Sequence, residues 1–497
     1  MKKLKIISCI LFIFAVSAIF PSCSKKQITG SNDLRFGFTT EPSTFDPLNP
    51  GNTADGRCVL FNVFEGLVKP DSDGILQPAL AESWTIEQDA LVYNFTLRKG
   101  VRFHDGSVLN PSDVKFSFDT AIASGYNGLS NIKEVSANGE DKVKITLNSP
   151  DLDFLPYLTV GIVKSGNNNR EKDISGTGPF SVESYTTQRS LVLKKFENYW
   201  HNKAHLDTVT IIFFENTDAM TAALRGGGID GARLTGSVTS QLAINEYDLI
   251  NSYSAAVQLL ALNNASAPLD DLRVRQALNY GIDVQNIIDS AFFGMGKPSR
   301  SPIIPGLTLY YQDSLEYPYN PERARSLLAQ AGFDGQNNKL TLEITVPSSY
   351  TMHVDTAQVI ADQLEKIGMT VNIKLVDWNT WLSDVYSARK YQSTIISLDS
   401  PNVSPKSFLS RYHSNAGNNF INFKNADFDG IFNSILSEKN ENERIRLYKA
   451  AQRAITENAA SVYIQDIFYF FVMRGGLFSG VLNYPLYVID FASISRN

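Results

Sequence analysis

Cysteine is scarce in this chain of 497 residues, which contains three. Cys9 and Cys23 lie within and at the end of an apolar N-terminal segment, so Cys58 is the one cysteine of the remaining body. A single thiol excludes an internal disulfide and a cysteine metal site in that body. The chain is nevertheless long enough to bury the cores of two or three lobes.

Histidine is almost as scarce, with five residues. His201 and His205 have the i, i+4 spacing of a shared metal site, but they lie in a stretch typical of a surface loop, and spacing fixes no acidic third ligand. The other three are scattered at His104, His353 and His413. We therefore expect no metal site, no cofactor and no Cys/His catalytic dyad.

The chain also lacks an excess of positive charge and a second long apolar run. Lys and Arg number 45 against 51 Asp and Glu, giving a net charge of −6. This balance disfavours a nucleic-acid partner, which would require a basic surface. The apolar stretch 468–472 is too short to cross a bilayer and is predicted to be a buried strand.

Catalytic motifs are missing as well. The nearest approach to a nucleophile elbow, at Gly236-Ser237-Val238, lacks the full G-x-S-x-G pattern. A formal G-x-G-x-x-G runs from Gly226 to Gly231, but it follows a helical stretch at 220–224 instead of a strand. We predict that these glycines end a helix, and that the protein is not an enzyme.

What is present begins with the N-terminus. A basic start at 1–5 and an apolar core at 6–20 predict a secretory signal peptide over residues 1–22. The sequence up to Cys23 resembles a lipobox, which predicts a lipidated Cys23 and a tether over 23–33. We expect an extracytoplasmic protein anchored to a membrane by lipid alone; the alternative is ordinary cleavage that releases the protein.

The segment 93–119 carries the strongest local pattern. Its first part alternates apolar and polar residues as a half-buried strand does, and two turns follow. Asn110 is predicted to cap a helix with Pro111 at its first position and Asp113 near its exposed amides.

This segment resembles the hallmark of the family 5 extracellular solute-binding proteins of ABC transporters, which include dipeptide-, oligopeptide- and nickel-binding proteins. Further stretches resemble blocks of the same family, and the resemblance extends from about Leu34 to about Phe471. These stretches are 40–47, 61–68, 76–84, 176–180 and 268–283.

The resemblance implies an α/β, two-lobed periplasmic-binding-protein-like fold of type II, cluster C, with an extra peripheral subdomain. The implied pieces are 34–56, 171–256 and 474–497 for lobe I, 57–170 for the subdomain, and 257–473 for lobe II. Periodicity itself predicts a βαβ unit over 340–375 with a right-handed crossover. It also predicts a strand at 34–38, helices that start near 270, 320 and 445, and a strand at 462–464.

Candidate binding residues come from the resemblance. Dipeptide-binding relatives carry a tryptophan after the second βαβ strand, matched by Trp378, and an aspartate about twenty residues later that accepts the peptide ammonium, matched by Leu398-Asp399. Glu41 and Thr53 match loops that border the cleft in relatives. The alternatives are a turn-capping role for Asp399 and a core role for Trp378.

Two departures separate this chain from those relatives. Ile396 replaces a second tryptophan, and no arginine stands near 346–350 to hold a peptide carboxylate. The carboxylate is then held differently, or the ligand is longer, or it is not a peptide. We predict a monomer that captures a peptide between two closing lobes for an ABC importer. The alternatives are a nickel chelate, haem or oligosaccharide as ligand, or a secreted hydrolase.

Overall fold

The computed structural model describes residues 32–126, 128–239, 242–313, 317–400, 404–484 and 486–497. The predicted signal peptide and Cys23 lie outside these ranges. Within them, no helix combines the length and apolar character that crossing a membrane requires.

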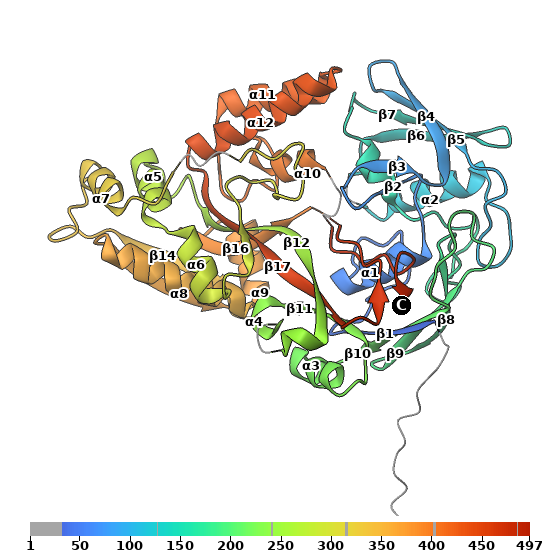
Figure 1. Cartoon of the computed structure of the whole chain (residues 1–497). Helices are drawn as coiled ribbons and strands as arrows, with labels where there is room; N and C mark the ends of the chain where they lie inside the picture. Colours follow the sequence, from blue (N-terminus) through green and yellow to red (C-terminus); the bar gives the residue numbers. More distant parts are fainter. Residues whose placement is uncertain (1–31, 127, 240–241, 314–316, 401–403, 485) are drawn as a thin grey trace, which may run out of the picture. The chain divides into compact units, whose positions relative to one another are not determined.

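The central element is a mixed sheet of 11 strands (Figure 1). Its order is β15-β14-β16-β12-β17-β11-β1-β10-β9-β8, with β13 on β17. The strands are β1 (Asp33–Phe38), β8 (Phe180–Thr186), β9 (Ser190–Lys195), β10 (Thr208–Phe213), β11 (Gly231–Thr235), β12 (Tyr247–Leu262), β13 (Gly296–Pro298), β14 (Thr341–Pro347), β15 (Thr370–Val376), β16 (Ser393–Asp399) and β17 (Ser461–Arg474).

The long strands β12 and β17 pair antiparallel through the middle of this sheet (Figure 1). The sequence predicted two separate stretches, 462–464 and 468–472, where the structure has one strand. The polar residues between them do not break it, because Gln465 donates a hydrogen bond to the buried Gln258 of β12 at 2.8 Å. The ladder is irregular between Tyr253 and Val257.

A second sheet contains the first strand of the segment 93–119. Its order is β4-β5-β7-β6, all antiparallel, and α2 (Pro111–Ala123) packs on it. Asn110 and Asp113 form the reciprocal capping box, with Pro111 in the first turn, so the predicted helix start is confirmed. The strands are β4 (Ala81–Glu87), β5 (Val92–Leu97), β6 (Ile132–Asn138) and β7 (Lys142–Leu147).

Two of the three later helices begin close to their predicted starts near 270 and 320, whereas the helix predicted from near 445 already begins at Glu441. Asp271 caps α5 and Asn320 caps α7, each through its side chain. The predicted βαβ unit is β14-α8-β15, with parallel strands. The other α-helices of at least five residues in the described ranges are α1 (Ala54–Val63), α3 (Thr217–Arg225), α5 (Leu272–Gly281), α6 (Val284–Ala291), α7 (Pro321–Gln330), α8 (Thr351–Lys366), α10 (Pro405–Leu409), α11 (Ala426–Ser437) and α12 (Glu441–Glu457).

The glycine run and the paired histidines take the structural roles predicted for them. Gly226 ends α3, and β11 starts at Gly231, which is the reverse of the strand-to-helix order of a dinucleotide site. His201 and His205 lie outside helices and strands and are exposed. In the described ranges, no group of three His, Cys, Asp or Glu side chains is arranged to hold a metal ion.

The C-terminal segment closes the core around α1, so the first and last parts of the described chain lie side by side, blue and dark red in Figure 1. The Asn62 amide donates to the Ile489 carbonyl at 2.8 Å and accepts from the Phe491 N–H at 2.9 Å. Cys58 donates to the Tyr487 carbonyl at 3.1 Å. Burial raises the pKa of this thiol to about 11, so it stays protonated at neutral pH.

Candidate ligand-binding site

A pocket of about 170 Å³ is bounded by four parts of the chain that are distant in sequence. They are the N-terminal loop with α1 and β2 (Val68–Pro70), the residues Tyr126 and 159–161, the end of β16, and the C-terminal segment 486–488. The lining residues used below are Pro47, Asn49, Asn52, Arg57, Phe61, Phe64, Glu65, Lys69, Tyr126, Asp399, Ser400 and Tyr487.

Helix α1 supplies one face of the pocket. Its pocket-lining residues recur at i, i+3 and i+4, the spacing of a single helix face. These residues are Arg57, Leu60 and Phe61, and the C-cap residue Phe64 also lines the pocket. The opposite face, with Cys58, Val59 and Asn62, is buried in the core. The core therefore fixes which side chains α1 turns toward the pocket.

Thr53 sets the start of this helix. Its hydroxyl accepts the Gly56 N–H at 2.9 Å as the N-cap and donates to the Glu41 carbonyl at 2.8 Å. The Glu41 carboxylate accepts the Tyr185 hydroxyl and the Gln188 N–H. Neither Glu41 nor Thr53 lines the pocket, and the contacts of both are with the protein itself.

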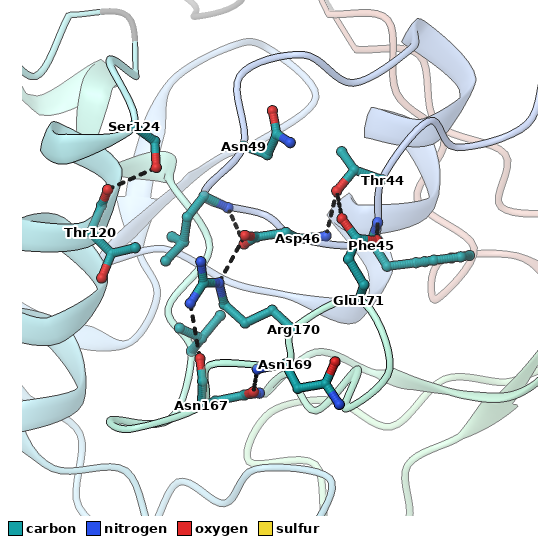
Figure 2. A network of polar contacts seen from close by, with 12 residues as sticks. Thr44, Phe45, Asp46, Asn49, Thr120, Ser124, Asn167, Asn169, Arg170 and Glu171 are labelled. Carbon is teal, nitrogen blue, oxygen red and sulfur yellow. Dashed lines mark hydrogen bonds and ion pairs between the residues drawn. The ribbon is translucent and has the colours of Figure 1, made fainter.

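The loop before α1, which contributes Pro47 and Asn49 to the pocket, is tied down by the polar network of Figure 2. The Arg170 guanidinium bonds the Asp46 carboxylate at 2.8 Å, and both side chains are largely buried. Glu171 accepts the Thr44 hydroxyl and the Phe45 N–H. Two side chains more than 100 residues away in the sequence, Arg170 and Glu171, therefore hold this loop in place.

Glu65 is the buried acidic residue of the lining, and its carboxylate bonds to other side chains of the protein. Its carboxylate accepts hydrogen bonds from Tyr199 at 2.7 Å, Trp200 at 2.8 Å and Thr177 at 3.1 Å. Burial raises the pKa of the Glu65 carboxyl, while nearby Lys69 and these three donors oppose that shift. With its oxygens occupied, Glu65 fixes the wall of the pocket and offers little to a ligand.

The pocket contains Asp399, the predicted ammonium acceptor. Asp399 ends β16 opposite Ala256 of β12, and its carbonyl accepts a hydrogen bond from Arg411 at 3.1 Å. Its carboxylate is exposed and makes no hydrogen bond or ion pair with any residue of the described ranges. Leu398, the residue before it, packs on an adjoining apolar core and is not part of the lining.

Trp378, the predicted aromatic wall, lies outside the lining. It starts the short helix α9 (Trp378–Thr380), which Asp377 caps, and remains 37% exposed. Its ring stacks on Trp381 with centroids 5.0 Å apart and tilts against Tyr350 at 5.5 Å. The structure therefore brings Asp399 to the pocket and leaves Trp378 in a separate aromatic stack.

Two pocket residues, Arg57 and Lys69, are not predicted by any sequence pattern described above. The Arg57 guanidinium donates to the Asn52 carbonyl at 3.1 Å, and the Lys69 ammonium lies 4.2 Å from the centroid of the Phe61 ring. The available sequence signal is modest: these two cations flank the largely apolar run 58–68.

Comparisons with known proteins identify the family of this chain. The family profile described as bacterial extracellular solute-binding proteins, family 5 Middle, matches residues 76–420, well over half of the chain. The heme-binding protein A of Haemophilus influenzae is 30% identical over 78% of this chain and 78% of its own length. A glutathione-binding protein of Salmonella typhimurium is 28% identical over 88% of each chain.

Solved structures confirm the predicted fold class. HbpA2 from Haemophilus parasuis superposes with a TM-score of 0.84 and 24% identity, covering 94% of this chain and all of that one. The mixed sheet and its helices are thus those of a periplasmic-binding-protein fold. The chain belongs to family 5 of the bacterial extracellular solute-binding proteins.

Proposed function

We propose that this solute-binding protein captures a peptide in the pocket that contains Asp399 and presents it to an ABC importer. The observation that carries the proposal is the Asp399 carboxylate, which lies in an aromatic-walled pocket without a partner in the described ranges. A ligand ammonium that leaves water must regain a carboxylate and other acceptors, or its desolvation is not recovered. Asp399 is free to supply the carboxylate.

The glutathione-binding relative supports a peptide ligand, because glutathione is itself a small peptide. Haem is the second candidate. The aromatic side chains of the wall favour a flat apolar ligand, and the relative named for heme binding has the higher identity. Trp378 and Leu398, both outside the lining, would contact only a ligand that extends beyond the pocket.

The remaining parts of the proposal concern the anchor and the lobes. We propose that Cys23 carries lipid and holds a monomer at the outer side of a membrane. We place the lobe boundary near residue 256, where the β12-β17 ladder loses its regular register between Tyr253 and Val257. A bulge bends a strand locally, which suits a hinge at this position.

Equilibrium dialysis against a mixture of synthetic peptides of graded length, followed by mass spectrometry, tests the ligand. We expect retained peptides with free N-termini, and weaker binding after N-acetylation. Asp399→Asn should weaken binding of free-amine peptides and leave N-acetylated ones unchanged. A parallel dialysis against haem tests the second candidate, and retention of haem but no peptide would replace the peptide proposal. Equal losses for both peptide forms would contradict the ammonium role of Asp399.

A further inference from the structure

Arg57 is a partly buried cation that has no acidic partner in the described ranges. Of the five N–H donors of its guanidinium, one is bonded, to the Asn52 carbonyl. No aspartate or glutamate of the described ranges forms an ion pair with it. A guanidinium that is partly removed from water, and that keeps free donors, is well suited to a planar anion such as a carboxylate.

Lys69 is a second cation of the same pocket, and it is fixed in place. Its ammonium lies over the Phe61 ring, and α1 brings Phe61 to the same helix face as Arg57. No ion pair of Lys69 is found in the described part of the chain, although Glu65 is near enough to feel its charge. Glu65 forms no ion pair with either cation in the described ranges, and its carboxylate oxygens instead accept three hydrogen bonds from neutral donors.

Tyr126 adds a neutral donor next to Arg57. Burial raises the pKa of its phenol, and the charge of Arg57 opposes that shift, which places the two groups near each other. Its hydroxyl has no hydrogen-bond partner in the described ranges. Tyr126 and Arg57 line the same pocket, so a phenol there can donate to the anion that the guanidinium binds.

We propose that Arg57, Lys69 and Tyr126 bind an anionic group of the ligand, which for a peptide is its C-terminal carboxylate. The pocket would then accept both ends of a short zwitterionic ligand: the carboxylate at these three donors and the ammonium at Asp399. This assignment rests on the proposed function for its peptide ligand. It supplies the carboxylate contact that the arginine missing near 346–350 leaves open.

The test compares each peptide retained in dialysis with its C-terminal amide, by calorimetric titration of the wild type and of Arg57→Gln. We expect amidation to weaken wild-type binding about 10- to 100-fold, the range for a charge-assisted hydrogen-bond pair. In Arg57→Gln the preference for the acid should fall to the smaller part that Lys69 supplies, and Arg57→Lys should restore part of the loss. Lys69→Gln should reduce the preference less, because a point charge lacks the bidentate geometry.

Arg323→Gln is the matched control, because Arg323 is exposed on α7 and outside the pocket. It should keep the full preference for the acid. Equal binding of acid and amide by the wild type, or an undiminished preference in Arg57→Gln, would overturn the anion site while peptide binding stands.

If no peptide is retained, the peptide proposal fails, and dialysis is repeated with yeast extract split by anion exchange. Retention of solutes from the anionic fraction by the wild type, lost in Arg57→Gln, would support the anion site. Retention confined to the neutral and cationic fraction, or of nothing, would overturn it.

Discussion

Two groups of charged side chains in this protein differ in whether the charges have partners within the protein. At Asp151 and Asp153 each carboxylate meets cations or hydroxyls from far along the chain. Lys406 of α10 forms an ion pair with the buried Asp151, and Arg444 of α12 lies 3.5 Å from Asp153, which also accepts the Tyr448 hydroxyl. In the pocket, by contrast, the charges of the lining are not paired with one another.

This difference distinguishes charges that stabilise the fold from charges that are available to a ligand. Paired buried charges fix segment 151–153 against α10 and α12, because breaking such a pair leaves an uncompensated ion. Unpaired charges in a pocket contribute nothing comparable to folding, and their partner has to come with the ligand. Segment 151–153 belongs to the predicted subdomain and α10 and α12 to predicted lobe II, so the paired group would also hold a closed form together.

The largest effect should come from breaking the paired group. Lys406→Met leaves Asp151, whose side chain is 4% exposed, without its cation, and should lower the free energy of unfolding by about 3 kcal/mol. Urea titration measures the loss. Lys439→Met is the control, because its ion pair with Asp89 is exposed on both sides and should leave stability unchanged. Equal effects of the two changes would contradict the comparison.

Low pH should lower the stability of the folded protein through protonation of His104. Burial lowers the pKa of this imidazole to about 4, and its ring contacts the Gly178 carbonyl at 3.0 Å and the Gly176 N–H at 3.2 Å. The glycine loop lies against α1, where a Cβ on Gly176 would come within 1.9 Å of the Val63 carbonyl oxygen.

The sign of the acid effect follows from proton binding. Between pH 6.5 and 4 the unfolded chain binds the His104 proton and the folded chain does not, so the stability from neutral His104 falls as pH drops. We expect a loss of roughly 2 kcal/mol from this group. In unfolding titrations across this range, His104→Gln should flatten the pH dependence relative to the exposed His205→Gln. Identical slopes for these two variants would contradict this assignment.

Removing an unpaired cation should affect the complex and not the free protein. Arg57→Gln should unfold at the wild-type urea concentration without ligand, because it breaks no ion pair. With a retained peptide at one hundred times the wild-type Kd, binding stabilises the wild type by about 2.7 kcal/mol. A tenfold weaker complex would leave about 1.4 kcal/mol. A large loss of stability without ligand would show that Arg57, like Lys406, stabilises the fold.

The smallest effect should come from the helix that presents Arg57. Thr53→Ala removes the N-cap of α1 and should cost about 1 kcal/mol in the same urea titration. Thr53→Ser retains the capping oxygen and should recover most of that loss. If Thr53 instead contacts the ligand, Thr53→Ala would weaken peptide binding while the stability stays at the wild-type value.

Local patterns were enough to predict the start of α2, α5 and α7, because Asn110, Asp271 and Asn320 cap helices through residues within three positions. The family resemblance led to Asp399. Arg57 and Lys69 could not be found in this way, since a missing acid partner is a property of the tertiary arrangement. Trp378 stacks on Trp381, three residues later, and that i, i+3 spacing already allowed a packing role.

The hydrogen bonds that join Asn62 to Ile489 and Phe491 affect the order in which the fold can form. They join residues more than 420 positions apart, so the core under α1 is completed only when the C-terminal segment arrives. At roughly 5–20 residues per second, a ribosome needs about 20–85 s to make the intervening chain. During that interval the pocket helix lacks its final support. Such a delay would leave this part of the core unformed until synthesis of the chain is almost complete.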